Sequence, residues 1–201
     1  MKPDEFTTFL TTAFKHLADY STDGSIHYHC MDWRHMSEIL ESGKAVYSSL
    51  INLCVWDKLG AGLGSLYRSS HELVFVFKNG TASHINNVEL GVHGRYRTNC
   101  WRYRGMHASN PEAKNLLNYH PTIKPVAMIM DALLDCSNPN DVVLDCFAGS
   151  GSTLLAAERT KRRARIIEID EHYGNVILHR WEKLTGKKAQ LLSNYEVANN
   201  E

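Results

Sequence analysis

A glycine-rich turn between two acidic side chains is the clearest candidate for chemistry in this sequence. The turn, residues 147–152 (FAGSGS), follows an apolar run that ends at Asp145, and Glu168 lies 17 residues beyond Gly151. Small residues let a ligand approach the backbone, and a helix that begins there offers free N–H groups. A carboxylate at Glu168 can accept hydrogen bonds from both hydroxyls of a ribose. The pattern predicts a nucleoside-binding site.

The acid before the turn indicates which kind of nucleoside. A carboxylate at Asp145 would repel a pyrophosphate but can accept a hydrogen bond from an ammonium group, and the turn lacks the third glycine of a dinucleotide-binding GxGxxG motif. This combination favours a nucleoside that bears an amino acid, S-adenosyl-L-methionine, over NAD. The alternative is a glycine turn without a ligand, as occurs in many α/β proteins.

A second candidate stands just ahead of the turn, at residues 120–125 (HPTIKP). Thr122 and Lys124 begin a predicted helix, where a hydroxyl and an ammonium group can bind a ligand carboxylate. Proline and threonine also commonly open helices without binding anything.

A basic aromatic segment fits nucleic acid. In residues 95–104 (RYRTNCWRYR), arginines alternate with rings, which suits phosphate neutralisation and base stacking. The candidate DNA contacts are Arg95, Arg97, Arg102 and Arg104. The alternative is a solvated loop that Tyr and Trp side chains anchor to the core.

The elements that must position these residues are those of an α/β fold. Apolar spacing, capping residues and β-rich runs predict the following elements. Helices are expected over 4–20, from Asp32 to Gly43, and over 124–135, 152–160 and 171–185; strands over 25–30, 49–56, 72–77, 141–146 and 164–170. Strand, glycine turn, helix, strand and acid form a βαβ unit, so we expect a mostly parallel sheet with a buried strand before the turn.

Composition bounds the remaining possibilities. With 22 Lys+Arg, 22 Asp+Glu and 43% apolar residues, the 201-residue chain is typical of one globular domain. Five cysteines without a CxxC pair indicate neither a disulfide framework nor a zinc site, and we expect no bound metal. The absence of a long apolar run excludes a transmembrane helix, and we expect a cytoplasmic protein of a prokaryote or phage.

Three motifs in this order, HPTIKP, VVLDCFAGSGST and IIEID, resemble the C-terminal half of the DNA methyltransferases that make N6-methyladenine or N4-methylcytosine. Their order is similar to the circularly permuted β class, and the resemblance extends from Glu5 to about Gly186. It implies a Rossmann-like fold, S-adenosyl-L-methionine as the cofactor and double-stranded DNA as the partner. The cofactor contacts that it implies are Thr122, Lys124, Asp145, Phe147, Gly149, Gly151 and Glu168.

The resemblance fails at the catalytic motif. The family holds a flipped base with D/N/S-P-P-Y/F/W, but no two of the five prolines here are adjacent. By the family's order the motif belongs before Glu5, so we expect an N-terminally truncated methyltransferase fold, or one completed by a separate chain or an upstream segment. The catalytic residues are therefore unknown.

We accordingly expect a single methyltransferase domain over 1–201 with a target-recognition insertion at 79–119. The cofactor half is complete, and a homodimer is possible. The alternative is a non-catalytic DNA-binding or regulatory module that retains the fold.

Overall fold

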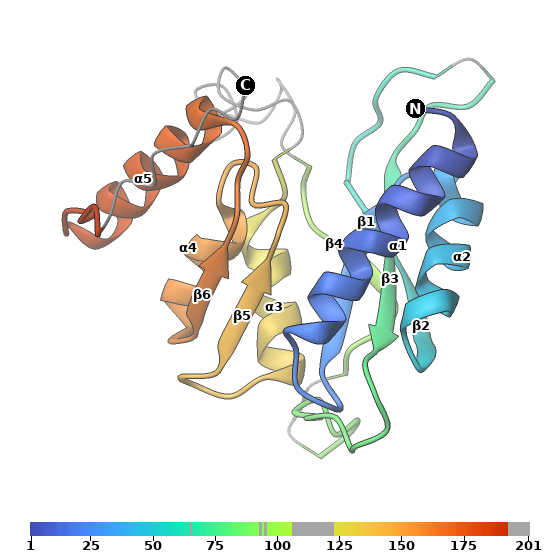
Figure 1. Ribbon diagram of the computed structural model, residues 1–201, viewed down its shortest axis with the longest axis horizontal. Coiled ribbons are helices and arrows are strands. Elements are labelled where there is room, and N and C mark those ends of the chain that lie inside the picture. The colour runs from blue at the N-terminus through green and yellow to red at the C-terminus, as the bar shows by residue number, and fades with distance from the viewer. Residues whose placement is uncertain (65, 93, 95, 106–122, 193–201) are drawn as a thin grey trace, which may run out of the picture.

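The computed structural model describes residues 1–64, 66–92, 94, 96–105 and 123–192, which form two β-sheets flanked by helices (Figure 1). The larger sheet has the order β1-β3-β2-β4, and the smaller pairs β5 with β6. The strands are β1 (Ile26–Met31), β2 (Ser49–Asp57), β3 (His71–Lys78), β4 (Cys100–Arg102), β5 (Val142–Asp145) and β6 (Arg163–Ile166). The helices are α1 (Pro3–Asp19), α2 (Met36–Val46), α3 (Val126–Cys136), α4 (Ser152–Thr160) and α5 (Glu171–Thr185), with a 3-10 turn at Trp33–His35.

Helix α2 shows why one predicted boundary is wrong. The sequence places the end of this helix at Gly43, but the helix continues to Val46. A side chain at Gly43 would meet the Phe77 ring, because a Cβ built there lies 2.2 Å from the nearest ring atom. Gly43 therefore permits close packing of α2 on β3 and does not end the helix. The predicted limits of α4 and α5 are confirmed.

One strand of the larger sheet departs from the predicted parallel arrangement. Strands β1 and β2 run in the same direction, as a helical crossover between them requires, but β3 inserts between them and is antiparallel to both. Only the short β2–β4 and β5–β6 pairs are parallel. The strand before the glycine turn is also less buried than predicted, since Val142 is 53% exposed.

The core lies on both faces of the larger sheet because alternate side chains of β3 point in opposite directions. Phe75 and Phe77 pack against α1 and α2, whereas Val74 and Val76 pack against Met128 of α3. The other side of α3 packs on α4 and the smaller sheet (Figure 1). Helix α3 thereby joins the two sheets. No helix in the described residues is long and apolar enough to span a membrane.

A histidine pair lies inside the first of these cores. The Tyr47 hydroxyl is 3.1 Å from Nδ1 of His27 and 2.9 Å from Nε2 of His29, and Ser25 Oγ is 3.1 Å from Nε2 of His27. Burial lowers the pKa of His27 to about 4 and, with the neighbouring His27, that of His29 to about 3. Both rings are therefore neutral in the fold.

We expect acid to destabilise the fold through this pair. The unfolded chain binds protons at both histidines below about pH 6.5, whereas the folded chain does not until about pH 4. The free energy of unfolding should therefore be largest above pH 6.5 and fall as pH drops, by at most about 1.4 kcal/mol per pH unit for each histidine. Urea unfolding between pH 7.5 and 4.5 measures this slope.

Two variants separate titration from packing. His27→Gln should make the slope shallower, because one proton-binding group is removed. Ser25→Ala removes only a hydrogen-bond partner and should lower stability at every pH with the slope unchanged. Equal slopes in the wild type and in His27→Gln would contradict the prediction.

Candidate cofactor-binding site

A pocket of about 170 Å³ opens where β5 ends and α4 begins. Its lining comes from the start of α3, from the glycine-rich turn and from the first turn of α4. The lining residues are Lys124, Ile129, Asp145, Phe147, Ala148, Gly149, Ser150, Ser152 and Thr153. The structure thus brings together four of the predicted cofactor contacts, from segments about 20 residues apart in sequence.

Asp145 holds the turn in shape. One oxygen of its carboxylate accepts a hydrogen bond from the Phe147 N–H at 2.9 Å, and the other accepts one from the Thr153 hydroxyl at 2.6 Å. The first bond bends the chain directly after β5, and the second attaches the turn to α4. Each oxygen can accept a further hydrogen bond, so Asp145 remains able to bind an ammonium group in the pocket.

Glu168 lies against the same turn from the end of β6. Its Oε2 atom accepts a hydrogen bond from the Gly149 N–H at 2.6 Å, and Oε1 accepts one from the Asp170 N–H at 3.1 Å. Because β5 and β6 are parallel neighbours, their carboxyl ends meet at one edge of the sheet. The two predicted acids therefore flank the glycine turn.

The turn needs its glycines for conformation and for packing. Gly149 and Gly151 have φ of +52° and +79°, in the left-handed region that side chains disfavour. A Cβ at Gly151 would also lie 3.0 Å from Ile177 of α5. Gly151 therefore lets α5 pack against the turn.

Lys124 reaches the pocket as one partner in a chain of three charges that sequence reasoning missed. The carboxylate of Glu72, at the start of β3, binds Lys124 Nζ at 3.2 Å and Lys58 Nζ at 3.0 Å. Burial would raise the pKa of Glu72, but these two cations hold it below its ordinary value. Burial would likewise lower the pKa of Lys124, but Cys30, Glu72 and Asp145 together raise it. Thr122 lies outside the described residues.

Replacing the bridging carboxylate should destabilise the fold in a pH-dependent way. Glu72→Gln leaves two half-buried ammonium groups without their partner, so the free energy of unfolding should fall by about 1–3 kcal/mol at pH 7. Because the pKa of Glu72 is lowered, this stabilisation is complete above about pH 4.3 and is lost as pH falls through the folded-state pKa. Urea unfolding at pH 7 and pH 3.5 measures both effects.

The matched control is Glu41→Gln, which removes an exposed carboxylate from α2. It should change stability by less than about 0.5 kcal/mol. Similar losses in the two variants, or a Glu72→Gln loss as large at pH 3.5 as at pH 7, would show that the charge bridge does not support Lys124.

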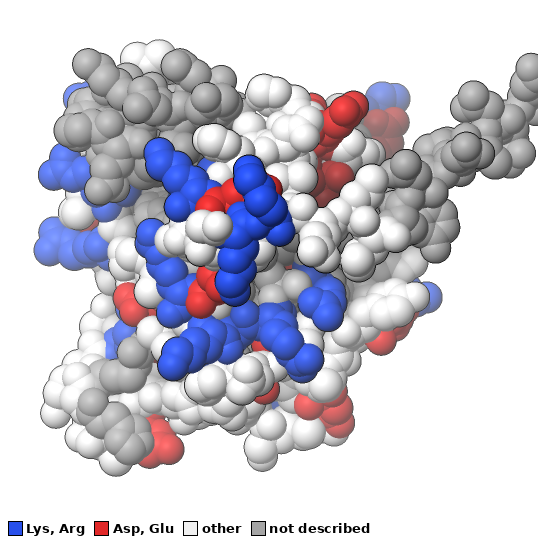
Figure 2. Space-filling model, turned by 90° about the vertical axis from the view of Figure 1, so that its left-hand side faces the viewer, with Lys and Arg blue, Asp and Glu red and all other residues white. Residues whose placement is uncertain are grey.

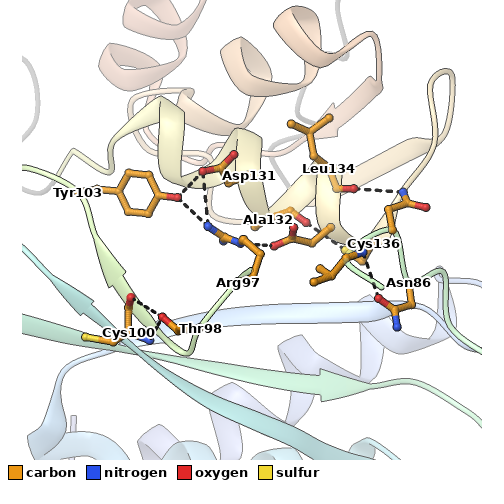
Figure 3. Close-up of polar contacts among 12 residues, drawn as sticks. Asn86, Arg97, Thr98, Cys100, Tyr103, Asp131, Ala132, Leu134 and Cys136 are labelled. Atoms are coloured by element: carbon orange, nitrogen blue, oxygen red, sulfur yellow. Dashed lines mark hydrogen bonds and ion pairs between the residues drawn. The ribbon is translucent and has the colours of Figure 1, made fainter. Parts of the chain in front are cut away.

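Arg97, one of the predicted DNA contacts, binds carboxylates of its own chain (Figure 3). Its Nε atom binds Asp135 at 2.9 Å, and an Nη atom lies 3.5 Å from Asp131 and 3.0 Å from the Tyr103 hydroxyl. Tyr103 in turn donates to Asp131, and the guanidinium stacks on Trp101. These contacts attach the basic segment to α3.

The aromatic rings of this segment also differ in exposure: one is buried in the core and another faces solvent. Trp101 is 6% exposed and packs in the core beside β2, so it is an anchor and not a base-stacking residue. Tyr96 is exposed. Arg102 and Arg104 also project into solvent, and Arg102 lies 3.5 Å from Asp57. Arg95 lies outside the described residues.

A family model described as DNA methylase, of the N6/N4 methyltransferase type, matches residues 2–179. The chain belongs to the DNA methylase family. This match covers the larger sheet, the charge bridge and the glycine turn, so both halves of the structure are parts of the family domain.

Curated relatives agree with this membership. The methylase YubD of Escherichia coli K12 is 28% identical over 141 residues, covering 70% of this chain and 55% of the relative. The type II methyltransferase M1.MboII of Moraxella bovis is 33% identical over 110 residues, covering 54% and 42%. The chain thus spans about half the length of the curated relatives it matches.

Solved structures confirm the α/β methyltransferase fold. The M1.HpyAVI–SAM complex matches with a TM-score of 0.71 and 21% identity, covering 87% of this DNA methylase and 82% of that chain. The PvuII cytosine-N4-specific DNA methyltransferase matches with a TM-score of 0.75 and 16% identity, covering 92% and 76%. The circular permutation is tested by neither match and stays a prediction.

Proposed function

We propose that this DNA methylase chain binds S-adenosyl-L-methionine at the glycine turn and forms the cofactor half of a DNA amino-methyltransferase. The observation that carries the proposal is the placement of two carboxylates, Asp145 and Glu168, on either side of the turn at the N-terminus of α4. The parallel ends of β5 and β6 produce this arrangement. The M1.HpyAVI structure, which shares the fold, is itself a complex with SAM.

The donors and acceptors of the pocket fit this cofactor. Asp145 suits the ammonium group of the methionine part, Lys124 suits its carboxylate, and Glu168 suits the ribose hydroxyls. The Phe147 ring is 56% exposed beside the pocket and offers an apolar face. When bound, the cofactor supplies an electrophilic methyl group. The protein's contribution here is to hold the cofactor in one orientation.

The proposed acceptor is an exocyclic amine of DNA, N6 of adenine or N4 of cytosine. A relative of this chain is the DNA adenine methyltransferase YhdJ of Escherichia coli K12, and the cytosine-N4-specific PvuII enzyme shares its fold, so both target types stay candidates. On the DNA side, Arg102 and Arg104 carry the proposed phosphate contacts, with Arg95 beside them in sequence. Residues 79–119 are the proposed target-recognition insertion.

Cofactor binding tests the proposal directly. Isothermal titration of the purified chain with S-adenosyl-L-methionine should show micromolar binding. Glu168→Ala should weaken it at least tenfold, because loss of a hydrogen-bonded carboxylate costs about 1.5–3 kcal/mol. The matched control, Glu171→Ala, removes an exposed acid from the first turn of α5 and should bind normally.

The outcomes separate the candidate functions. Circular dichroism must first show that each variant is folded. A folded wild-type chain that does not bind the cofactor would overturn the proposal and favour a DNA-binding or regulatory module that retains the fold. Equal weakening by the two variants would contradict the assigned role of Glu168.

We further propose that a β-strand from outside the described residues, on an upstream segment or a separate chain, fits between β1 and β5 and brings the D/N/S-P-P-Y/F/W motif. In the described part of the chain, the outer edges of both strands lack a backbone partner. Leu144 of β5 and Met31 of β1 pack against the same core cluster, so both edges adjoin one core. Both strands run in the same direction in Figure 1, opposite to β3.

The exposure of β1 and the composition of the two edges support this second proposal. All six residues of β1 are only half-buried, although five consecutive residues of its neighbour β3 are buried. Neither edge carries a lysine or a proline, the residues that commonly protect open edges from pairing. An added strand would satisfy the free N–H and C=O groups of both edges.

A peptide titration tests the strand. The probe is a synthetic peptide with an apolar strand followed by Asp-Pro-Pro-Tyr, and the readout is amide hydrogen exchange. Exchange should slow at both residues 26–31 and residues 142–145. The control peptide carries prolines at alternate strand positions, which remove ladder donors, and it should protect neither edge. Protection by both peptides, or of one edge alone, would contradict an inserted strand.

A further inference from the structure

A basic surface that the cofactor site does not use covers the outer side of the smaller sheet. Six exposed cations project from the end of α4, from β6 and from the end of α5 and the turn beyond it. We call this set the outer basic surface; its residues are Arg159, Lys161, Arg163, Arg165, Lys183 and Lys187. Figure 2 views the molecule from this side and shows blue side chains gathered across its centre.

The ends of α4 and α5 are held together beneath this surface. The Trp181 indole donates to the Glu158 carboxylate at 3.1 Å, which joins the last turns of the two helices. On β6, Arg163 and Arg165 are two residues apart and therefore project from the same face, roughly 7 Å from each other. The cations thus belong to one continuous surface and not to scattered loops.

The charge of this surface is not neutralised within the described residues. None of its six cations has a carboxylate partner there, although Lys188 beside them binds Glu182 at 2.8 Å. Arg163 and Arg165 donate only to backbone carbonyls. These six cations therefore have no ion pair within the described residues and are available to bind an anion.

The distribution of charge along the chain shows the same concentration. Residues 159–188 hold nine of the 22 basic residues and four of the 22 acidic ones, a net charge of +5. All other residues together have a net charge of −5. Two of these nine basic residues, Arg162 and Arg180, are bonded within the fold, and the other seven are exposed.

We propose that the outer basic surface binds the phosphate backbone of duplex DNA, as a second contact independent of Arg102 and Arg104. The inference deepens the proposed function, because it names how the DNA partner is held. Long, exposed and unpaired cations suit phosphates without sequence preference. Arg102 and Arg104 lie on or beside β4, in the other sheet, so the two contacts are separate.

Salt dependence of DNA binding tests this surface. Two double variants, Arg163→Gln/Arg165→Gln and Lys183→Gln/Lys187→Gln, each remove two charges from it. For each, affinity for a mixed-sequence duplex should fall about tenfold, and the slope of log K against log salt should shrink by about 2, because each phosphate contact contributes about 0.9. Fluorescence anisotropy at several salt concentrations measures both quantities.

The matched control is Lys15→Gln/Lys44→Gln, which removes two exposed charges from α1 and α2. This variant should keep the wild-type slope. An equal loss of slope in the control, unchanged slopes in both surface variants, or no DNA binding by the wild type would overturn the inference. An acidic protein partner, in place of DNA, would give unchanged slopes.

Cofactor titration of the same variants separates this inference from the proposed function. All three double variants should bind S-adenosyl-L-methionine as the wild type does, since none of their residues lines the pocket. If the wild type fails to bind cofactor but its DNA slope depends on the surface variants, the proposed function fails and the DNA contact stands.

Discussion

Helix α3 is the constraint on which the rest of the structure depends, because it packs against both sheets. Met128 and Ala132 fill the core of the larger sheet, while Leu133 packs against α4. Its last turn is fixed by Arg162, whose guanidinium donates to the Ser137 hydroxyl and carbonyl and to the Thr160 carbonyl. The same helix binds Arg97 through its carboxylates. Displacing α3 would therefore disturb the cofactor pocket, the basic segment and the contact between the sheets together.

The pocket acids combine a structural role with a binding role, and this combination has a physical consequence. Asp145 and Glu168 already accept backbone and hydroxyl hydrogen bonds within the turn, so their positions are set before a ligand arrives. A preorganised carboxylate binds an ammonium or a ribose without the cost of ordering a flexible side chain. The ion pair with Glu72 likewise fixes the position of the Lys124 ammonium group. The site is therefore built from groups whose rotamers the fold has fixed.

Local sequence patterns predicted much of this arrangement. The limits of α4 and α5 could be predicted because Asp170 caps one helix and glycines bound both. The insertion of β3 between β1 and β2 could not, since strand order depends on long-range packing and local periodicity does not encode it. In the sequence, Glu72 is a single acidic residue near the start of an apolar strand. The two lysines that it binds, Lys58 and Lys124, lie 14 residues before it and 52 residues after it. The ion pairs of Arg97 with α3 could not be predicted, because an arginine among rings has the same pattern whether it meets phosphate or a carboxylate on a distant helix.

The charged groups of the two sheets converge on one edge, and this convergence links the cofactor pocket to the open strand edges. Strand β5 ends at Asp145, and β2 ends beside Lys58. Glu72 starts the antiparallel β3 at the same edge, opposite Trp56. Met31 at the end of β1 and Leu144 near the end of β5 pack against one core cluster, so the ends of the two strands lie near each other. A strand that fits between β1 and β5 in their common direction must also end here. The residues that follow it would emerge beside the pocket, where an amine acceptor has to meet the cofactor's methyl group.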